Sequence, residues 1–252
     1  MTLLKVDNLT KKFRKNGEWF KVVDDISFTI EEGECLGVVG ESGCGKSTTA
    51  NIIARLQKED EGEIIFGDRK ISGGFGLKAV GRELQMIFQN PQDSFDPRDT
   101  VLQGIMQGCA SYKIYSRSEL QTKAMELFPY VGLKPEYKNR KTSELSGGEC
   151  QRAAVARALI SEPKLLICDE VTSALDVLMQ AQIIDLLKNL KKDRNMSILF
   201  ITHDLPLASV LCDRIAVMHK GKIIEIGPAK KVLKTPSRQE TKKMIDAVLT
   251  VS

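Results

Sequence analysis

Residues 40–48 read GESGCGKST, and this stretch restricts the fold of the chain more than any other. It fits the pattern G-x-x-x-x-G-K-[ST] at every fixed position. The apolar run CLGVVG before it predicts a strand, and the periodic stretch KSTTANIIARL after it predicts a helix. In that setting the loop N–H groups point inward and bind a polyphosphate. Lys46 can reach the β- and γ-phosphates and the Ser47 hydroxyl can bind Mg²⁺. The expected nucleotide site is therefore Gly40, Glu41, Ser42, Gly43, Cys44, Gly45, Lys46, Ser47 and Thr48.

Short apolar runs alternate with helix-like segments along much of the remaining chain. KLLIC, SILFI and RIAVM predict buried strands, and LMQAQIIDLLKNLKK and LPLASVLC predict helices between them. This alternation indicates an α/β fold with a parallel sheet covered by helices. Residues 3–30 predict strands, whereas residues from 90 to about 145 are helix-like. We expect one domain over residues 1–252, with a core at 1–89 and 160–228, a helical subdomain at about 90–159 and a short helical tail at 229–252.

The composition narrows the compartment and the kinds of ligand. No apolar run approaches the roughly 20 residues that a membrane-spanning helix needs, and the first residues lack the apolar core of a signal peptide. The formal net charge of +4 does not by itself indicate a nucleic-acid partner. The six cysteines show no CxxC spacing, and the two histidines are not spaced as metal ligands. We expect a chain in the cytosol or on a membrane surface, with reduced thiols and no cysteine-bound metal.

Two carboxylates, Asp169 and Glu170, end the apolar strand KLLICDE. Ligands of open parallel sheets bind where strands end, and neighbouring side chains on a strand point opposite ways. We therefore expect separate roles: Asp169 holds the Mg²⁺ shell, and Glu170 is the general base for the attacking water. An acidic pair after a strand is also typical of a solvated turn. The phosphate loop upstream favours the catalytic interpretation.

Two further polar residues follow predicted strands in the same way. Gln89 comes after LQMIF, and His203 comes after SILFIT. Each can also be an ordinary loop residue, but both fall at the expected ligand edge of the sheet. Gln89 can coordinate Mg²⁺ or orient the water, and His203 can hydrogen-bond the γ-phosphate.

A second helix start, LSGGECQRAAVARAL, begins at residue 145. The free N–H groups and the dipole of such a helix favour an anion, but this stretch has no lysine beside its glycine pair. On its own it is an incomplete phosphate site.

Taken in order, GESGCGKST, Gln89, LSGGE, LLICDE, SALD and THD resemble the motifs of ABC-transporter ATPase subunits, from about residue 3 to residue 228. FQNPQDSFDPRDTV, VTSALDVLMQAQIIDLL and HDLPLASVLCDRIAVMHKGKIIEIGP are similar to the ATPases of oligopeptide, dipeptide and nickel importers, and more specifically to the second of their two non-identical ATPase subunits. The resemblance implies a P-loop NTPase core, an N-terminal antiparallel β-subdomain and an inserted helical subdomain.

The family's ATPases dimerise head to tail, and each ATP lies between the phosphate loop of one subunit and the signature of the other. The resemblance thus implies that Ser146, Gly147 and Gly148 bind the γ-phosphate of a nucleotide held by another chain, which supplies the lysine. It places Asp176 at the dimer seam and Phe13 on the adenine, with Trp19 and Phe20 as rivals for that stacking role. It also implies that residues 89–108 face membrane subunits.

The function implied is an ATPase that hydrolyses ATP with Mg²⁺ to ADP and phosphate and so drives import of peptides or nickel/metal chelates. The implied partners are a second ATPase subunit, either a non-identical paralogue or a second copy, two transmembrane permease subunits, and indirectly an extracellular solute-binding protein. Nucleic acid is not among the expected partners, and the implied location is the cytoplasmic face of the membrane.

Two alternatives remain open. A non-transport ATPase of this fold would act on nucleic acid or ribosomes, but such proteins usually show a long coiled-coil insertion or two ATPase halves, and this sequence has neither. A regulatory module without turnover would lack Glu170 or His203, and both are present.

Three departures from the family pattern stand out. Glu149 stands where glutamine is frequent and Val171 where proline is frequent. The chain ends at Ser252 without the cysteine-bearing tail of many oligopeptide members, which favours the nickel or metal-chelate branch.

Overall fold

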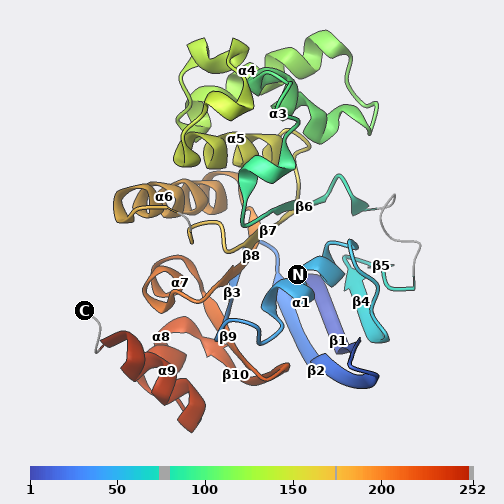
Figure 1. Cartoon of the computed structure of the whole chain (residues 1–252), viewed down its shortest axis with the longest axis vertical. Coiled ribbons are helices and arrows are strands. Elements are labelled where there is room, and N and C mark those ends of the chain that lie inside the picture. Colours follow the sequence, from blue (N-terminus) through green and yellow to red (C-terminus); the bar gives the residue numbers. More distant parts are fainter. Residues whose placement is uncertain (74–79, 174, 250–252) are drawn as a thin grey trace.

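The computed structural model describes residues 1–73, 80–173 and 175–249, and within them a mostly parallel six-stranded sheet runs through the centre of the molecule (Figure 1). The order across this sheet is β10-β9-β3-β8-β7-β6. Its strands are β3 (Cys35–Val39), β6 (Leu84–Ile87), β7 (Leu165–Asp169), β8 (Ser197–Thr202), β9 (Arg214–His219) and β10 (Lys222–Pro228). All neighbours pair in parallel except β9 and β10. The parallel sheet expected from the apolar runs is confirmed.

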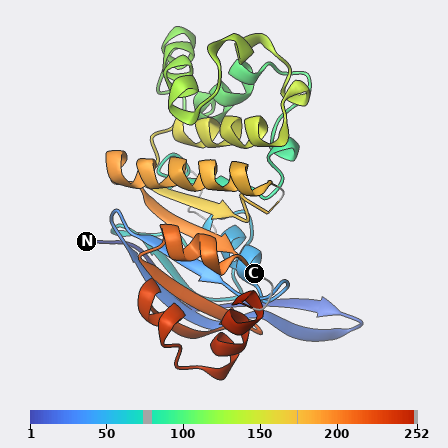
Figure 2. The ribbon, with the colours of Figure 1, turned by 90° about the vertical axis from the view of Figure 1, so that its left-hand side faces the viewer.

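A second, antiparallel sheet has the order β2-β1-β4-β5. Its strands are β1 (Thr2–Lys15), β2 (Glu18–Glu31), β4 (Glu61–Phe66) and β5 (Arg69–Lys70). β1 and β2 form a long hairpin whose tip projects away from the rest of the chain (Figure 2). The N-terminal antiparallel sheet that the family resemblance implied is therefore present.

The chain between β6 and β7 is helical and lies at one end of the molecule, at the top of Figure 1. It contains α3 (Val101–Ala110), α4 (Arg117–Val131) and α5 (Gly147–Leu159), with the 3₁₀ turns η1 (Pro91–Ser94), η2 (Pro135–Asn139) and η3 (Thr142–Glu144). Each long helix begins with a capping box, from Thr100, Ser116 and Ser146 respectively. In a capping box, the side chain of the capping residue accepts a hydrogen bond from the backbone N–H three residues later. The side chain of that later residue accepts one from the backbone N–H of the capping residue. The expected helical insertion is present, whereas the exact domain boundaries remain a proposal.

Helices also follow the central strands, as expected for alternating strands and helices. They are α1 (Lys46–Ile53), α6 (Val177–Arg194), α7 (Leu205–Leu211), α8 (Ala229–Lys234) and α9 (Gln239–Leu249). The last two form the expected helical tail up to residue 249, and residues 250–252 lie outside the described part. No helix in the described residues is long and apolar enough to cross a membrane.

The central sheet is the middle layer, and its strands send alternate side chains into two separate cores. On β7, Leu166 and Cys168 pack into the core shared with the inserted helices, whereas Leu165 and Ile167 pack into the core shared with the antiparallel sheet. Because both faces are covered, the central strands β3, β7 and β8 are buried throughout and mostly apolar. The cysteines at positions 35, 44, 109, 150, 168 and 212 are all buried free thiols. Polar groups are thus left to the strand ends, where the candidate site lies.

Candidate functional site

Residues 40–48, called here the phosphate loop, run from the end of β3 into the first turn of α1. Gly45 precedes α1 with a φ of 109°, in the left-handed region where side chains are strained. A Cβ at Gly45 would lie 2.4 Å from the carbonyl oxygen of Val22, and a Cβ at Gly40 would lie 2.2 Å from that of Met218. Backbone from two other strands thus closes against the loop, so glycine is required at both positions.

Lys46, the first residue of α1, is buried and points back over the phosphate loop. Its Nζ donates to the carbonyl oxygens of Gly40 at 2.8 Å and Glu41 at 3.0 Å. The carboxylate of Glu170 lies 3.9 Å from the same nitrogen. The ammonium group is therefore held at the centre of the loop, where a bound phosphate group can replace the neutral carbonyl oxygens as its partner.

Asp169 and Ser47 form the second part of the site. The Ser47 hydroxyl donates to Asp169 Oδ1 at 2.9 Å, which joins the start of α1 to the end of β7. Burial raises the pKa of Asp169, and the nearby charge of Glu170 raises it further. The hydrogen bond from Ser47 and the charge of Lys46 oppose that shift. A buried carboxylate of this kind is stabilised by any cation that binds next to it.

Glu170 follows at the strand end and faces a different set of partners. Its φ of 48° is unusual for a residue with a side chain, and such strain is frequent at functional sites. Gln89 Nε2 donates to its Oε2 at 3.3 Å, and His203 Nδ1 lies 3.7 Å from its Oε1. The two carboxylates thus have different partners, because Asp169 contacts Ser47 whereas Glu170 contacts Gln89, and their separate roles stay a prediction.

Ser173 is a residue of this site to which the sequence assigned no role. Its hydroxyl donates to the backbone carbonyl of Glu170 at 3.0 Å and lies 3.5 Å from Gln89 Nε2. The only sequence signal for it was its place at the start of SALD, whose Ala174 lies outside the described residues.

The segment Leu145–Glu149, called here the signature segment, begins α5. The Ser146 hydroxyl accepts from the Glu149 N–H at 3.3 Å, and Glu149 Oε2 accepts from the Ser146 N–H at 2.8 Å. That backbone hydrogen bond is the main cause that lowers the pKa of Glu149. Glutamate thus serves the capping box as glutamine would, and the departure from the family pattern leaves the cap intact.

The two glycines of the signature segment have opposite surroundings. No atom lies within 4 Å of the place a Gly147 Cβ would take, so this position is open. A Gly148 Cβ would lie 2.0 Å from the Cε atom of Met179 on α6. Asp176 caps that helix by accepting from the Met179 N–H at 2.9 Å. Met179 thus links the two helix starts: its side chain contacts Gly148 and its backbone N–H is bound by Asp176.

The structure does not bring every expected site residue together. Lys46, Ser47, Gln89, Asp169, Glu170 and His203 form one connected group. In the described part of the chain, no hydrogen bond or ion pair joins Ser146 to the phosphate loop, and its side chain contacts Glu149. The signature segment therefore presents an anion-binding helix start, with an open position at Gly147, outside the connected group.

The three candidate aromatic residues for adenine lie near the tip of the β1–β2 hairpin. Phe13 pairs across the strands with Phe20, and their ring centres are 6.3 Å apart. Trp19 is 68% exposed and Phe20 is 45% exposed, whereas Phe13 is half-buried. Val22, whose carbonyl oxygen closes on Gly45, lies only two residues from Phe20 along β2. The rings therefore lie between the hairpin tip and Val22, the residue that contacts the phosphate loop.

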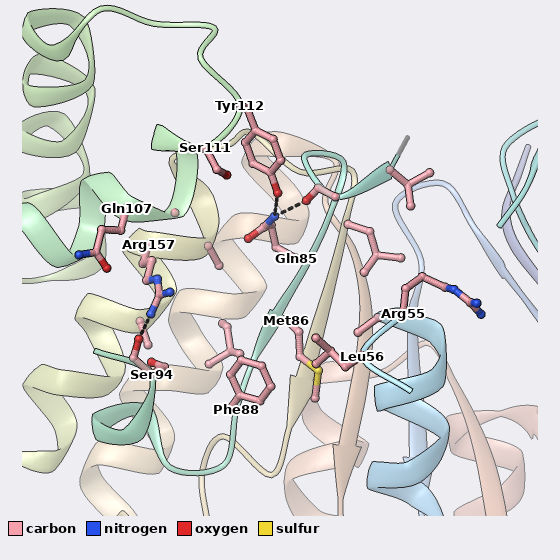
Figure 3. Close-up of a pocket in the computed structure, with 18 residues that line it drawn as sticks. Arg55, Leu56, Gln85, Met86, Phe88, Ser94, Gln107, Ser111, Tyr112 and Arg157 are labelled. Carbon is pink, nitrogen blue, oxygen red and sulfur yellow. Dashed lines mark hydrogen bonds between the residues drawn. The ribbon is translucent and has the colours of Figure 1, made fainter. Parts of the chain in front are cut away.

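A groove of about 280 Å³ lies between the inserted helices, β6 and the end of α1 (Figure 3). Phe88 and Leu56, which line it, are 39% and 55% exposed. Arg157 also lines it, and its guanidinium donates to the carbonyl oxygen of Ser94. Burial lowers the pKa of Arg157, so an additional acidic partner would stabilise its charge. The groove combines exposed apolar surface with a poorly solvated cation.

Comparison with known proteins gives a consistent result. The family model described as ABC transporter matches residues 23–173. The chain is 42% identical to the oligopeptide transport ATP-binding protein OppF of Bacillus subtilis, over 98% of this chain and 82% of that protein. It is 40% identical to the glutathione import ATP-binding protein GsiA of Pectobacterium atrosepticum, over 98% of this chain but 41% of that longer protein.

Solved structures show the same likeness. A dimeric ATP-binding cassette in a post-hydrolysis state, bound to ADP and Pi, superimposes with a TM-score of 0.81 at 30% identity, covering 90% of this chain and 99% of that one. CbiO1 of Clostridium perfringens, part of the transporter complex cbiONQ, gives a TM-score of 0.81 at 27% identity, over 99% of this chain and 96% of that one. The site described above thus lies on a fold shared with known ATP-binding cassettes.

Proposed function

This chain belongs to the ABC transporter family of ATP-binding proteins, and from that premise we propose that it is the ATP-hydrolysing, energy-coupling subunit of an importer for peptides or nickel/metal chelates. The observation that carries the proposal is the connected group at the carboxyl edge of the sheet, in which Lys46, Ser47 and Asp169 lie beside Glu170 and Gln89. The names of the matched relatives, oligopeptide transport and glutathione import, favour peptides as cargo. They also favour transport over an ATPase that acts on nucleic acid or ribosomes.

The residues of the phosphate loop are suited to hold the phosphates of ATP. Its backbone N–H groups and the buried Lys46 supply positive charge, and the glycines allow close approach of the backbone. Ser47, Asp169 and Gln89 present only oxygen ligands for a metal ion, and the raised pKa of Asp169 shows a carboxylate that a cation would stabilise. These groups fit Mg²⁺, which binds proteins through few carboxylates and completes its shell with phosphates and water. When bound, Mg²⁺ would neutralise charge that develops on the phosphates.

We assign the proton transfer to Glu170. As a general base it accepts a proton from the attacking water, and its carboxylate lies 3.9 Å from the Lys46 ammonium group. Gln89 lies within hydrogen-bond distance of Glu170 and can orient the same water. For His203, which is exposed and lies 3.7 Å from Glu170, we propose the role of donor to the γ-phosphate.

The signature segment completes the site of another chain. It is an anion-binding helix start without a lysine, and Gly147 leaves its N-terminal end open. We therefore propose that Ser146, Gly147 and Gly148 bind the γ-phosphate of ATP held by a second ATPase subunit, with Asp176 at the seam. ATP carries the phosphate group that joins the two subunits and ADP does not, so hydrolysis releases the dimer.

The overall proposal is tested by isolating the intact complex from cells. We expect the chain to copurify with a second ATPase subunit and two transmembrane permease subunits, and to hydrolyse ATP in response to a loaded solute-binding protein. Isolation with ribosomes or nucleic acid, and without membrane proteins, would contradict it.

Phe13 is our choice for the residue that stacks on adenine, because it is half-buried and paired with Phe20, whereas Trp19 lies one pair nearer the hairpin tip. Phe13→Ala is expected to weaken ATP binding by roughly tenfold, since stacking on a base contributes about 1–3 kcal/mol. Titration with a fluorescent ATP analogue measures this change. Trp19→Ala is the matched control, and a larger loss in that variant would assign the stacking to Trp19.

The groove is the proposed docking site for the membrane subunits. Ser94, Gln107 and Gly108 from the segment 89–108 line it, and its exposed Phe88 and Leu56 offer apolar contacts. We expect the occupant to be a short amphipathic helix with an acidic residue that pairs with Arg157. Such docking would hold the chain at the cytoplasmic face of the membrane and transmit the closure of the ATPase dimer.

Leu56→Glu is expected to impair assembly with the membrane subunits while ATP binding by the free chain stays unchanged. The side chain is 55% exposed, so the substitution places a charge on the groove without disturbing a core. Copurification with the permease subunits measures the loss. Val210→Glu, at 54% exposure on α7, is the matched control and should assemble normally. If both variants assembled equally well, the groove would not be part of the interface with the membrane subunits.

A further inference from the structure

Gln151 on α5 is a buried amide to which the mechanism above assigns no role. It lies one helical turn after Gly147 and is 1% exposed. Within residues 1–73, 80–173 and 175–249, its Nε2 atom has no hydrogen-bond partner. A buried N–H without an acceptor costs free energy, so any rearrangement that supplies an acceptor is favoured.

A cavity of about 380 Å³ lies beside this amide. Three segments line it: the start of α5 with Gly147, the segment Gln89–Asp93 after β6, and the turn after β7 at Val171 and Leu175. The first two segments carry Gly147 and Gln89, which have roles in the proposed reaction. The third directly follows the proposed general base Glu170. The cavity is therefore a space across which the signature segment and the catalytic group can approach one another.

The polar atoms around the cavity are suited to accept a hydrogen bond. The segment Gln89–Asp93 lines the cavity, and its residues carry backbone carbonyls, three side-chain amide oxygens and the Asp93 carboxylate, all of which are acceptors. The other lining residues, Gly147, Val171 and Leu175, offer only backbone groups. A shift that narrows the cavity would therefore bring the Gln151 amide toward acceptors that lie mainly on the segment headed by Gln89.

We propose that Gln151 is a positioning residue for ATP hydrolysis: as ATP closes the dimer, its Nε2 donates to the segment Gln89–Asp93 and fixes Gln89 relative to the signature segment. The inference rests on the proposed function, because it assigns the closing motion to ATP binding between two subunits. In the free chain the unpaired Gln151 N–H group is destabilising, and in the closed state it gains an acceptor. The closed state is stabilised by this difference without any contact between Gln151 and ATP.

Gln151→Met tests the assignment, since methionine is similar in length and shape but has no N–H group. The nucleotide-free chain should unfold at an equal or higher temperature, because the unpaired donor is gone. In the intact complex, kcat/KM for ATP should fall by roughly fivefold to tenfold, the size of one lost hydrogen bond. Most of the change should appear as a higher KM, because closure on ATP is what becomes less favourable. Gln121→Met, on the exposed face of α4, is the control and should change neither quantity.

Two results would overturn the assignment. Normal kcat/KM in Gln151→Met, measured in a complex whose wild-type form is active, would remove Gln151 from the reaction and leave the proposed function intact. A fall in unfolding temperature that accompanies the loss of activity, seen in Gln151→Leu as well, would show that the amide only stabilises the fold. An inactive wild-type complex would instead contradict the proposed function, and this inference with it.

Discussion

Glu170→Gln is expected to lower ATP turnover by roughly 10²–10⁴-fold and to leave ATP binding intact. The variant keeps the size of the side chain and its contact distance to Gln89, but an amide cannot accept the proton of the attacking water. Lys46 and Ser47 are untouched, so the phosphates keep their partners. Single-turnover hydrolysis and equilibrium ATP binding, measured on the same preparation, separate the two effects.

Asp169→Asn is the matched control for this experiment. It removes the neighbouring carboxylate, which contacts Ser47 and not Gln89. We expect it to raise the Mg²⁺ concentration needed for ATP binding, an effect that Glu170→Gln should not share. Hydrolysis at the wild-type rate by Glu170→Gln would contradict the assignment of the general base.

Gly147→Asp is the second substitution with a large expected effect. It places a carboxylate at the open end of the signature segment, where we propose that the γ-phosphate of the other subunit binds. The new carboxylate should repel the γ-phosphate and block its access to the N–H groups of the helix start. We expect turnover of the assembled dimer to fall by at least about a hundredfold, the scale seen when an oxyanion loses one hydrogen-bond donor. ATP binding by the isolated chain should not change, because its own phosphate loop is intact.

Gly147→Ala separates charge from size. Nothing lies within 4 Å of the added Cβ, and the backbone of Gly147 is not in the left-handed region, so alanine is accommodated without strain. It should retain far more activity than the aspartate variant. Wild-type turnover in Gly147→Asp would show that the signature segment does not bind phosphate in another chain.

The sequence predicted those parts of the site that depend on local patterns. The phosphate loop could be predicted from its glycine spacing between a strand and a helix, because this pattern lies within residues 40–48. The separate roles predicted for Asp169 and Glu170 came from their adjacent positions at a strand end, and the two side chains do have different partners. The central sheet was predictable for the same reason, since strands covered on both faces are apolar throughout.

Other features depend on contacts between distant segments and gave no sequence signal. The closure of Val22 and Met218 onto the phosphate loop is set by strand packing across two sheets. Gln151 was read only as part of a motif, because its lack of a partner depends on how three separate segments surround it. The adenine residue also stayed open, since Phe13, Phe20 and Trp19 all lie on one hairpin.

The central claim, that a second chain completes the ATP site, is tested most directly by the turnover of the isolated chain across a dilution series. We predict that it binds ATP at every concentration, but that turnover per chain falls toward zero on dilution. Adding a second copy in excess, or the paralogous ATPase subunit, should restore it. Full turnover per chain at the highest dilution, with no dependence on concentration, would show that one chain suffices and would contradict the account.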